Sequence, residues 1–188
     1  ATVQRLADDY AEELKALIEH CCLPINRGVT PSDFPLAGLT QAQLDTLPLV
    51  LAEVEDLYPL SPMQQGLLFQ SLYSEGSGDY INQMRVDVRG LDVPRFERAW
   101  QAAVDRHEVL RSGFLWQAEL NQPLQVVYKH LHVTVVEHDW QGREDRAAAL
   151  DGLAATQRAQ GFALEQAPLL NLVLVRTGPS NHCLLYTS

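Results

Sequence analysis

The sequence predicts an α/β (α+β) fold for most of the chain, because helix and strand patterns alternate from Tyr58 onward. Residues 82–88 alternate apolar and polar side chains, as a half-buried strand does. Residues 92–104 instead repeat apolar side chains at helical spacing behind Asp92, which can cap a helix. The mostly apolar run 169–175 is typical of a central strand.

The first predicted element is an amphipathic helix that begins at residue 2. Its apolar residues recur at helical spacing with acidic residues on the other face, and Pro24 with Gly28 ends the pattern. The apolar positions are Val3, Leu6, Tyr10, Leu14, Leu17 and Cys21. An isolated helix with such a stripe needs a surface that buries it.

Residues 28–55 are expected to form an extended linker. Pro31 and Pro35 favour extended backbone and remove two hydrogen-bond donors. Further on, Thr40 and Gln43 have the spacing of a capping box, which predicts a short helix that stops at Pro48. A separate domain should then start at residue 56.

The elements of this domain follow in chain order. Ser61 and Gln64 form a second capping box with Pro62 at the first helical position, and they start a helix that runs to about Tyr73. The remaining predicted elements are a loop at 75–79, the strand at 82–88, the helix from 92, strands at 112–116, 124–128 and 133–136, a helix at 145–158 closed by Gly161, and the central strand.

The composition excludes several classes of protein. The 188 residues include 14 Lys and Arg against 24 Asp and Glu, and the net charge of −10 does not favour nucleic acid. No apolar run approaches the roughly 20 residues of a membrane span. The N-terminus lacks the pattern of a signal peptide, and the three cysteines give no disulfide framework. We therefore expect a cytoplasmic protein without membrane or nucleic-acid partners.

Generic catalytic and metal-binding motifs are missing from the sequence. His130 and His132 could share one face of a strand, but no carboxylate or cysteine spacing completes a zinc site with them. There is also no Gly-rich phosphate loop and no Ser-centred nucleophile elbow. No bound metal is expected.

Two segments hold more capping, turn and glycine residues than packing alone requires, and the first of them is 58–69. A glycine inside a helix costs up to about 1 kcal/mol relative to alanine, so Gly66 should mark close approach by another backbone or by a substrate arm. On spacing alone, helix capping and burial of Leu67 with Leu68 explain the rest. The polar and turn-forming residues of the segment are Ser61, Pro62, Gln64, Gln65 and Gly66.

The segment 106–114 is the second, and it lies at a helix end that leads into a strand. It holds Arg106, His107, Arg111 and Phe114. Basic residues are favourable at the C-terminus of a helix in their own right. On spacing alone, therefore, capping of the helix end also explains this second segment.

Together, these two segments resemble the first two core motifs of the condensation domains of nonribosomal peptide synthetases, in order and in spacing. The resemblance runs from about Val54 to Arg176. It implies a V-shaped pair of lobes similar to chloramphenicol acetyltransferase, and this chain would supply the start of the first lobe. In that family, an amine on one carrier protein attacks a thioester on another and forms an amide.

The resemblance also implies partners and residue roles. Upstream and downstream peptidyl carrier domains would present substrates on phosphopantetheine, next to epimerization and adenylation domains, and no cofactor would bind directly. The first-motif residues Ser61, Pro62, Gln64, Gln65 and Gly66 would border the tunnel entrance. In the second motif, Arg106 and Arg111 would form structural ion pairs that brace the channel floor, beside His107 and Phe114. The Ser-Pro-Met-Gln-Gln-Gly form of the first motif looks like the subtype that accepts a donor ending in a D-residue.

The third motif of the family, HHxxxDG, is not in this sequence. It should follow a strand ending in a Tyr-Thr-Ser-like stretch, and Asn181-His182-Cys183, which lacks Asp-Gly, is expected to precede that strand. We therefore expect 56–188 to be the N-terminal part of a condensation domain, without a catalytic residue and inactive by itself. Residues 183–188 also match one reading frame of a sequencing-library adapter, and both origins stay open.

Residues 1–27 resemble the C-terminal helix of an upstream epimerization or condensation-type domain, followed by its linker. The alternative is a free-standing N-terminal helix. Two other functions also stay open. One is a non-catalytic interaction module whose acidic helix docks a partner chain, and the other is a coenzyme A-dependent acyltransferase of the same fold.

Overall fold

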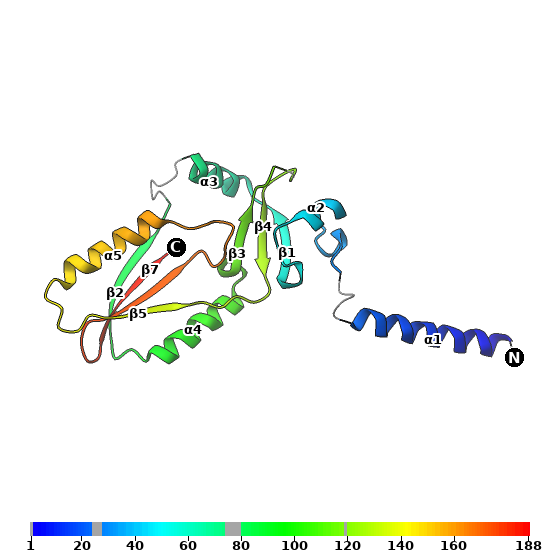
Figure 1. The fold of residues 1–188 in the computed structure, drawn as a ribbon, viewed down its shortest axis with the longest axis horizontal. Helices are drawn as coiled ribbons and strands as arrows, with labels where there is room; N and C mark the ends of the chain where they lie inside the picture. The colour runs from blue at the N-terminus through cyan, green and yellow to red at the C-terminus, as the bar shows by residue number, and fades with distance from the viewer. Residues whose placement is uncertain (1, 24–27, 74–79, 119) are drawn as a thin grey trace.

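The computed structural model describes residues 2–23, 28–73, 80–118 and 120–188, which form two β-sheets with flanking helices and a separate N-terminal helix (Figure 1). The α-helices are α1 (Thr2–Cys22), α2 (Gln41–Thr46), α3 (Pro62–Tyr73), α4 (Val93–Arg106) and α5 (Arg146–Gln160). The strands are β1 (Val54–Pro59), β2 (Gln83–Arg89), β3 (Ser112–Leu115), β4 (Leu124–Tyr128), β5 (Val135–Asp139), β6 (Asn171–Arg176) and β7 (Asn181–Thr187). Single 3-10 turns are η2 (Pro31–Asp33), η3 (Leu51–Glu53) and η4 (Glu108–Arg111).

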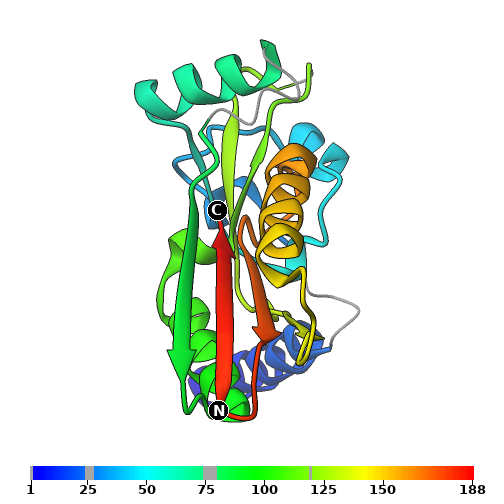
Figure 2. The same ribbon diagram turned by 90° about the vertical axis from the view of Figure 1, so that its left-hand side faces the viewer.

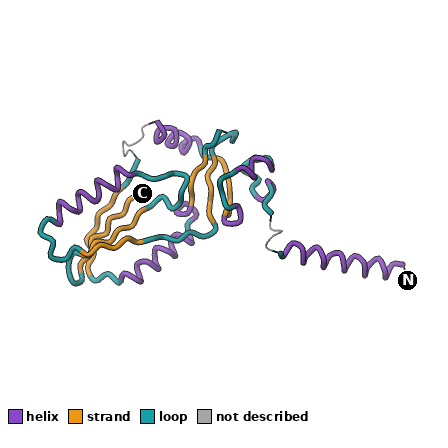
Figure 3. The backbone as a smooth tube through the Cα atoms, viewed as in Figure 1, coloured by secondary structure: helices purple, strands orange, loops and turns teal. Residues whose placement is uncertain are grey.

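The smaller sheet has the antiparallel order β1-β4-β3, and the segment before β1 covers one of its faces. Figure 3 shows this segment as loops and short helical turns between α1 and β1. Its buried side chains Phe34, Ala37, Leu44 and Leu47 form one core with Val54, Leu57, Leu115, Leu124 and Val126. The extended backbone expected around Pro31 and Pro35 is therefore wrong, because this stretch forms η2 and further turns that let its apolar side chains pack on the sheet.

The larger sheet has the order β2-β7-β6-β5, with β5 and β6 parallel and the other pairs antiparallel. Helices α4 and α5 lie on its opposite faces (Figure 2). Strand β6 lies inside the sheet and has four consecutive buried residues, so the predicted central strand is confirmed. Strand β7 supplies Leu184 to the α4 side and Cys183 with Leu185 to the α5 side.

Most of the predicted elements are confirmed with small shifts in their ends. Thr40 caps α2 as expected, Asp92 caps α4, and Gly161 ends α5 with a positive φ of 62°. The strand predicted at 133–136 begins two residues later, at Val135. The loop predicted at 75–79 lies outside the described residues.

Three details of the prediction are wrong. Val86 on β2 is exposed, because β2 is an edge strand of the larger sheet rather than a half-buried one. Leu67 is expected to be buried with Leu68, but only Leu68 is buried in α3. His182 lies within β7 and does not precede it.

Leu44 tests whether the segment before β1 belongs to the folded domain. Its side chain is completely buried in the core of the smaller sheet, whereas Leu36 in the same segment is 66% exposed. We predict that Leu44→Ala lowers the free energy of unfolding by about 2–5 kcal/mol, because a buried leucine leaves a cavity. Leu36→Ala is the matched control and should change it by less than about 0.5 kcal/mol. Equal effects in denaturant unfolding would mean that the segment is not packed in solution.

Candidate functional site

The first motif begins α3 with a complete capping box. The backbone N–H of Ser61 donates to Oε1 of Gln64 at 2.9 Å, and the backbone N–H of Gln64 donates to Oγ of Ser61 at 3.3 Å. Pro62 is the first residue of the helix, as predicted. The side chain of Gln65 turns back and donates from Nε2 to the carbonyl oxygen of Leu60 at 3.1 Å. The motif thus fixes the direction in which α3 leaves β1.

Gly66 lies on an exposed part of α3. No heavy atom of the described residues lies within 4 Å of the position where a Cβ would be. Close approach by another described backbone segment of this chain, one of the two explanations expected for this glycine, is therefore wrong. The space beside Gly66 is open, and approach by a substrate arm stays a prediction.

The second motif contributes a buried arginine to an ion pair. Arg111 is only 5% exposed, and its guanidinium pairs with the carboxylate of Glu55 and donates to the carbonyl oxygen of Tyr128. Nε of Arg111 donates to the carbonyl oxygen of Val104 at 3.2 Å. One side chain therefore joins η4 to β1, β4 and α4. A buried cation is tolerated because these partners replace the water that it loses.

The other residues of the second motif have different surroundings. Arg106 is exposed and forms no ion pair with any described residue, so the pair implied for it is not present in that part of the chain. His107 connects α4 to η4, since its N–H donates to Ala103 and its carbonyl oxygen accepts from Leu110. The N–H of Phe114, in β3, donates to the carbonyl oxygen of Leu164 at 2.9 Å.

A chain of side-chain hydrogen bonds connects the two motifs. Nε2 of Gln64 donates to Oε1 of Gln125 at 2.8 Å, and Nε2 of Gln125 donates to Oγ of Ser112 and to the hydroxyl of Tyr58, both at 3.0 Å. Oγ of Ser112 then donates to the carbonyl oxygen of Glu108 at 2.8 Å. The two motifs, far apart in sequence, therefore meet over the smaller sheet.

Sequence reasoning missed Gln125, Glu55 and Tyr58 as members of this site. The only signal for Gln125 is a single polar residue inside an otherwise apolar strand. The pKa of the Tyr58 phenol is raised above its ordinary value. Burial is the largest cause, and the negative charges of Glu108 and Asp56 add to it. Tyr58 is therefore protonated at neutral pH and can act as a hydrogen-bond donor as well as an acceptor.

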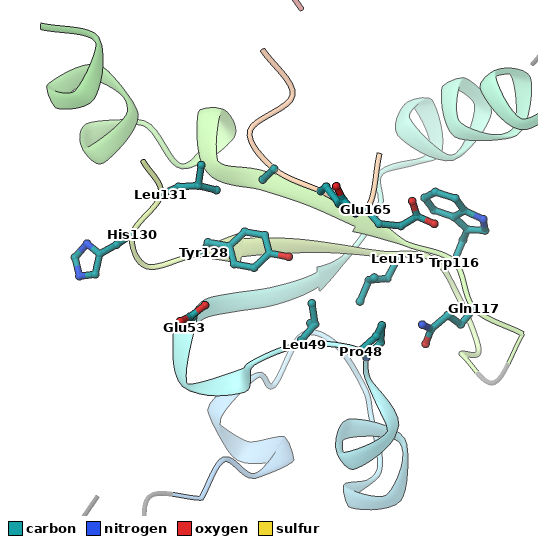
Figure 4. Close-up of a pocket in the computed structure, with 12 residues that line it drawn as sticks. Pro48, Leu49, Glu53, Leu115, Trp116, Gln117, Tyr128, His130, Leu131 and Glu165 are labelled. Atoms are coloured by element: carbon teal, nitrogen blue, oxygen red, sulfur yellow. The ribbon is translucent and has the colours of Figure 1, made fainter. Parts of the chain in front are cut away.

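A cleft of about 740 Å³ lies on the other side of the smaller sheet (Figure 4). Pro48 and Leu49 face Leu115 and the ring of Tyr128 across it, with Glu165 above. Burial, followed by the charge of Glu53, raises the pKa of Tyr128. None of the residues predicted for the two motifs lines this cleft.

The described ranges contain no candidate metal cluster and no candidate membrane-spanning helix. No group of three or more His, Cys, Asp and Glu side chains there is arranged to hold a metal ion. His130 and His132 lie in the loop between β4 and β5, not on a strand. No helix in the described part of the chain is long and apolar enough to cross a membrane.

The fold is shared with solved condensation domains. The condensation domain of the monacolin K polyketide synthase MokA superimposes with a TM-score of 0.61 at 24% sequence identity, over 72% of this chain and 30% of that one. The arrangement is thus the mixed α/β fold of chloramphenicol acetyltransferase-like condensation domains, and the predicted fold class is confirmed.

Sequence comparison gives the same result. The family model "Condensation domain" matches residues 54–188. One polypeptide of the linear gramicidin synthase of Brevibacillus parabrevis is 40% identical over 177 residues, which cover 93% of this chain and 2% of that protein. A second polypeptide of the same synthase is 41% identical over 181 residues, covering 94% of this chain and 4% of that protein. The chain therefore belongs to the condensation domain family, and it spans only a few per cent of the length of these relatives.

The ion pair of Arg111 makes a prediction about stability. Removing one partner of a buried pair typically costs about 3 to 5 kcal/mol, and because the Glu55 side chain is 43% exposed we expect the lower end of this range for Arg111→Ala. Arg111→Lys should recover only part of the loss, since lysine cannot donate to three partners in one plane.

Arg106→Ala is the matched control for this experiment. It removes the same charge from the same motif at an exposed position, so its effect should stay within about 0.5 kcal/mol. Chemical denaturation of the four proteins measures the difference. Similar losses for Arg106→Ala and Arg111→Ala would contradict the structural role of Arg111.

Proposed function

We propose that residues 54–188 act as the first lobe of a condensation domain that forms an amide bond in nonribosomal peptide synthesis. The family match over the whole of this segment carries the proposal. In the proposed reaction, an amine on one phosphopantetheine arm attacks the thioester carbonyl carbon on another. A C–N bond forms, the C–S bond breaks, and the thiol leaves after proton transfer from the amine.

The residues of this chain would contribute positioning to that reaction. Ser61, Gln64 and Gln65 are engaged in hydrogen bonds within the chain, so they hold α3 and leave the space beside Gly66 for a substrate arm. Proper orientation of two reactants is itself a large part of the rate gain in such transfers. Residues 61, 62, 64, 65 and 66 are therefore proposed to border the tunnel entrance, and 106, 107, 111 and 114 to support its floor.

The proposal includes partners and setting. The substrates would come from upstream and downstream peptidyl carrier domains, with epimerization and adenylation domains as neighbours in a cytoplasmic synthetase. The relatives, which are synthase polypeptides far longer than this chain, support a multidomain setting. The donor is proposed to end in a D-residue, on the form of the first motif.

The 188-residue chain should form no dipeptide when it is incubated with two loaded carrier proteins, because its sequence has no HHxxxDG motif. A rate typical of enzymes, about 1 per second or faster, would contradict this expectation. The positive test is a chimera in which residues 54–188 replace the matching segment of a gramicidin synthase condensation domain.

The chimera should form dipeptide from carrier-bound thioesters, with a D-residue donor preferred over its L-isomer. Coenzyme A thioesters should be poor donors in the same assay. A chimera that melts cooperatively and still forms no dipeptide would overturn the proposed function. A preference for the L-donor would overturn only the stereochemical part.

We propose that residues 1–27 are the C-terminal part of an upstream domain, which covers the apolar stripe of α1. No described residue of α1 is buried, and Val3, Leu6 and Tyr10 are at least 70% exposed. Helix α1 extends away from the two sheets (Figure 1). The similarity to the second gramicidin synthase polypeptide covers 94% of the chain, so it reaches well into the residues before the family match. Residues 183–188 lie within that match, which favours a native β7 over the adapter origin.

Charges placed on the stripe test this proposal. We predict that Leu6→Asp with Leu14→Asp leaves the unfolding midpoint of the chain unchanged, because α1 contributes no buried surface, and that it reduces self-association. Gln4→Asp with Ala16→Asp adds the same charge away from the stripe and should leave self-association as it is. Light scattering and thermal melts report both properties. A lower midpoint for the stripe variant would mean that α1 packs on this chain itself.

A further inference from the structure

The hydrogen bonds between the two motifs have a direction that the backbone imposes. A backbone N–H can only donate, so the N–H of Ser61 fixes the side chain of Gln64 with Oε1 toward the cap. Nε2 of Gln64 must then face Gln125 and donate to its Oε1. This in turn points Nε2 of Gln125 at Ser112 and Tyr58.

The other end of the chain of hydrogen bonds is fixed in the same way. The carbonyl oxygen of Glu108 can only accept, and it takes the hydroxyl hydrogen of Ser112. Oγ of Ser112 is then free to accept from Gln125. The amides of Gln64 and Gln125 and the hydroxyl of Ser112 are therefore each oriented by their neighbours, and the backbone groups of Ser61 and Glu108 at the two ends set the same direction.

Gln125 is the central member, and its position explains why it can connect the two motifs. It lies in β4, the middle strand of the smaller sheet, directly opposite Tyr58 of β1 and Phe114 of β3. Its side chain oxygen and both hydrogens of its amide nitrogen are used, and the residue is only 6% exposed. Leaving such buried groups without partners costs more than the hydrogen bonds gain.

Helix α3 depends on this connection because none of its described residues belongs to an apolar core cluster, whereas α4 and α5 each pack several side chains into one. Of its described residues only Leu68 is buried, whereas Met63, Phe69 and Tyr73 are more than 70% exposed. With so little apolar burial, the capping box and the bond from Gln64 to Gln125 hold the first turn of α3 in place.

We infer that Gln125 is a positioning residue that couples the start of α3 to η4 and β3 through the direction of this hydrogen-bond chain. The inference rests on the proposed function in one respect, namely that α3 borders the substrate tunnel. The coupling itself is a property of the folded chain, so it can be tested without substrate and without turnover.

Gln64→Glu separates capping from coupling. Glutamate at this position still accepts from the N–H of Ser61, so the capping box remains. It cannot donate to Gln125, whose amide can satisfy the new carboxylate only by turning its nitrogen toward it. That turn removes the N–H groups from Ser112 and Tyr58, so a change in α3 should loosen residues 108–115 in the second motif.

The experiment measures amide hydrogen exchange of the full 188-residue chain, as protection factors. Gln125→Leu should lower the protection of both 62–73 and 108–115 by about tenfold, because it removes hydrogen bonds to both. Gln64→Glu alone should lower the protection of 108–115 several-fold. The double variant should be no worse at 108–115 than Gln125→Leu alone, because the connection is already cut.

Gln101→Leu is the matched control. Gln101 also bridges two segments, since its Nε2 donates to Leu131 at 2.9 Å and its Oε1 accepts from the N–H of Val133 at 3.1 Å. Its loss should affect residues near 101 and 131–133 and leave α3 as it is. If Gln125→Leu fails to fold, Gln64→Glu, at a half-buried position, still gives the decisive comparison.

Three results would overturn the inference. One is unchanged protection of 108–115 in Gln64→Glu. Another is that the double variant lowers the protection of 108–115 by the sum of the two single effects. The third is that Gln101→Leu lowers the protection of α3 as much as Gln125→Leu does. None of these depends on amide formation, so failure of the coupling and failure of the proposed function are distinguished.

Discussion

The buried guanidinium of Arg111 is the constraint on which this part of the fold depends. A cation that has lost its water requires partners, and Arg111 finds them on β1, β4 and α4 at once. Those partners belong to the smaller sheet and to the helix that covers the larger one. The single side chain therefore ties the smaller sheet to α4, which covers one face of the larger sheet, with more directional contacts than apolar packing supplies.

The smaller sheet carries two different surfaces. Alternation along β4 places Leu124 and Val126 toward the apolar segment 28–49 and Gln125 toward the first motif. The apolar face supplies stability, and the polar face supplies a fixed geometry for α3. Because both faces belong to the same short strands, a one-residue shift in the pairing register of β4 would disrupt both faces at once.

Local signals in the sequence predict the helix ends well, whereas long-range pairing escapes them. The capping boxes at Thr40 and Ser61 and the glycine that ends α5 depend on neighbouring residues only, and all are present. Strand β1 was missed because a bulge between Val54 and Asp56 breaks its alternation. The packing of 28–49, the Arg111 pair and the role of Gln125 all rest on contacts between distant positions, which no periodicity in the sequence records.

The hydrogen bonds between the two motifs indicate a site that holds a helix in position. Its polar groups are satisfied by one another, from Ser61 through Gln125 to Glu108, and such groups are poorly suited to take up or release protons during a reaction. Their fixed orientation is instead suited to holding a helix whose outer surface is open. If the proposed function holds, a proton acceptor must therefore come from a residue outside the two motifs, and the motifs would act by holding α3 where a substrate arm passes.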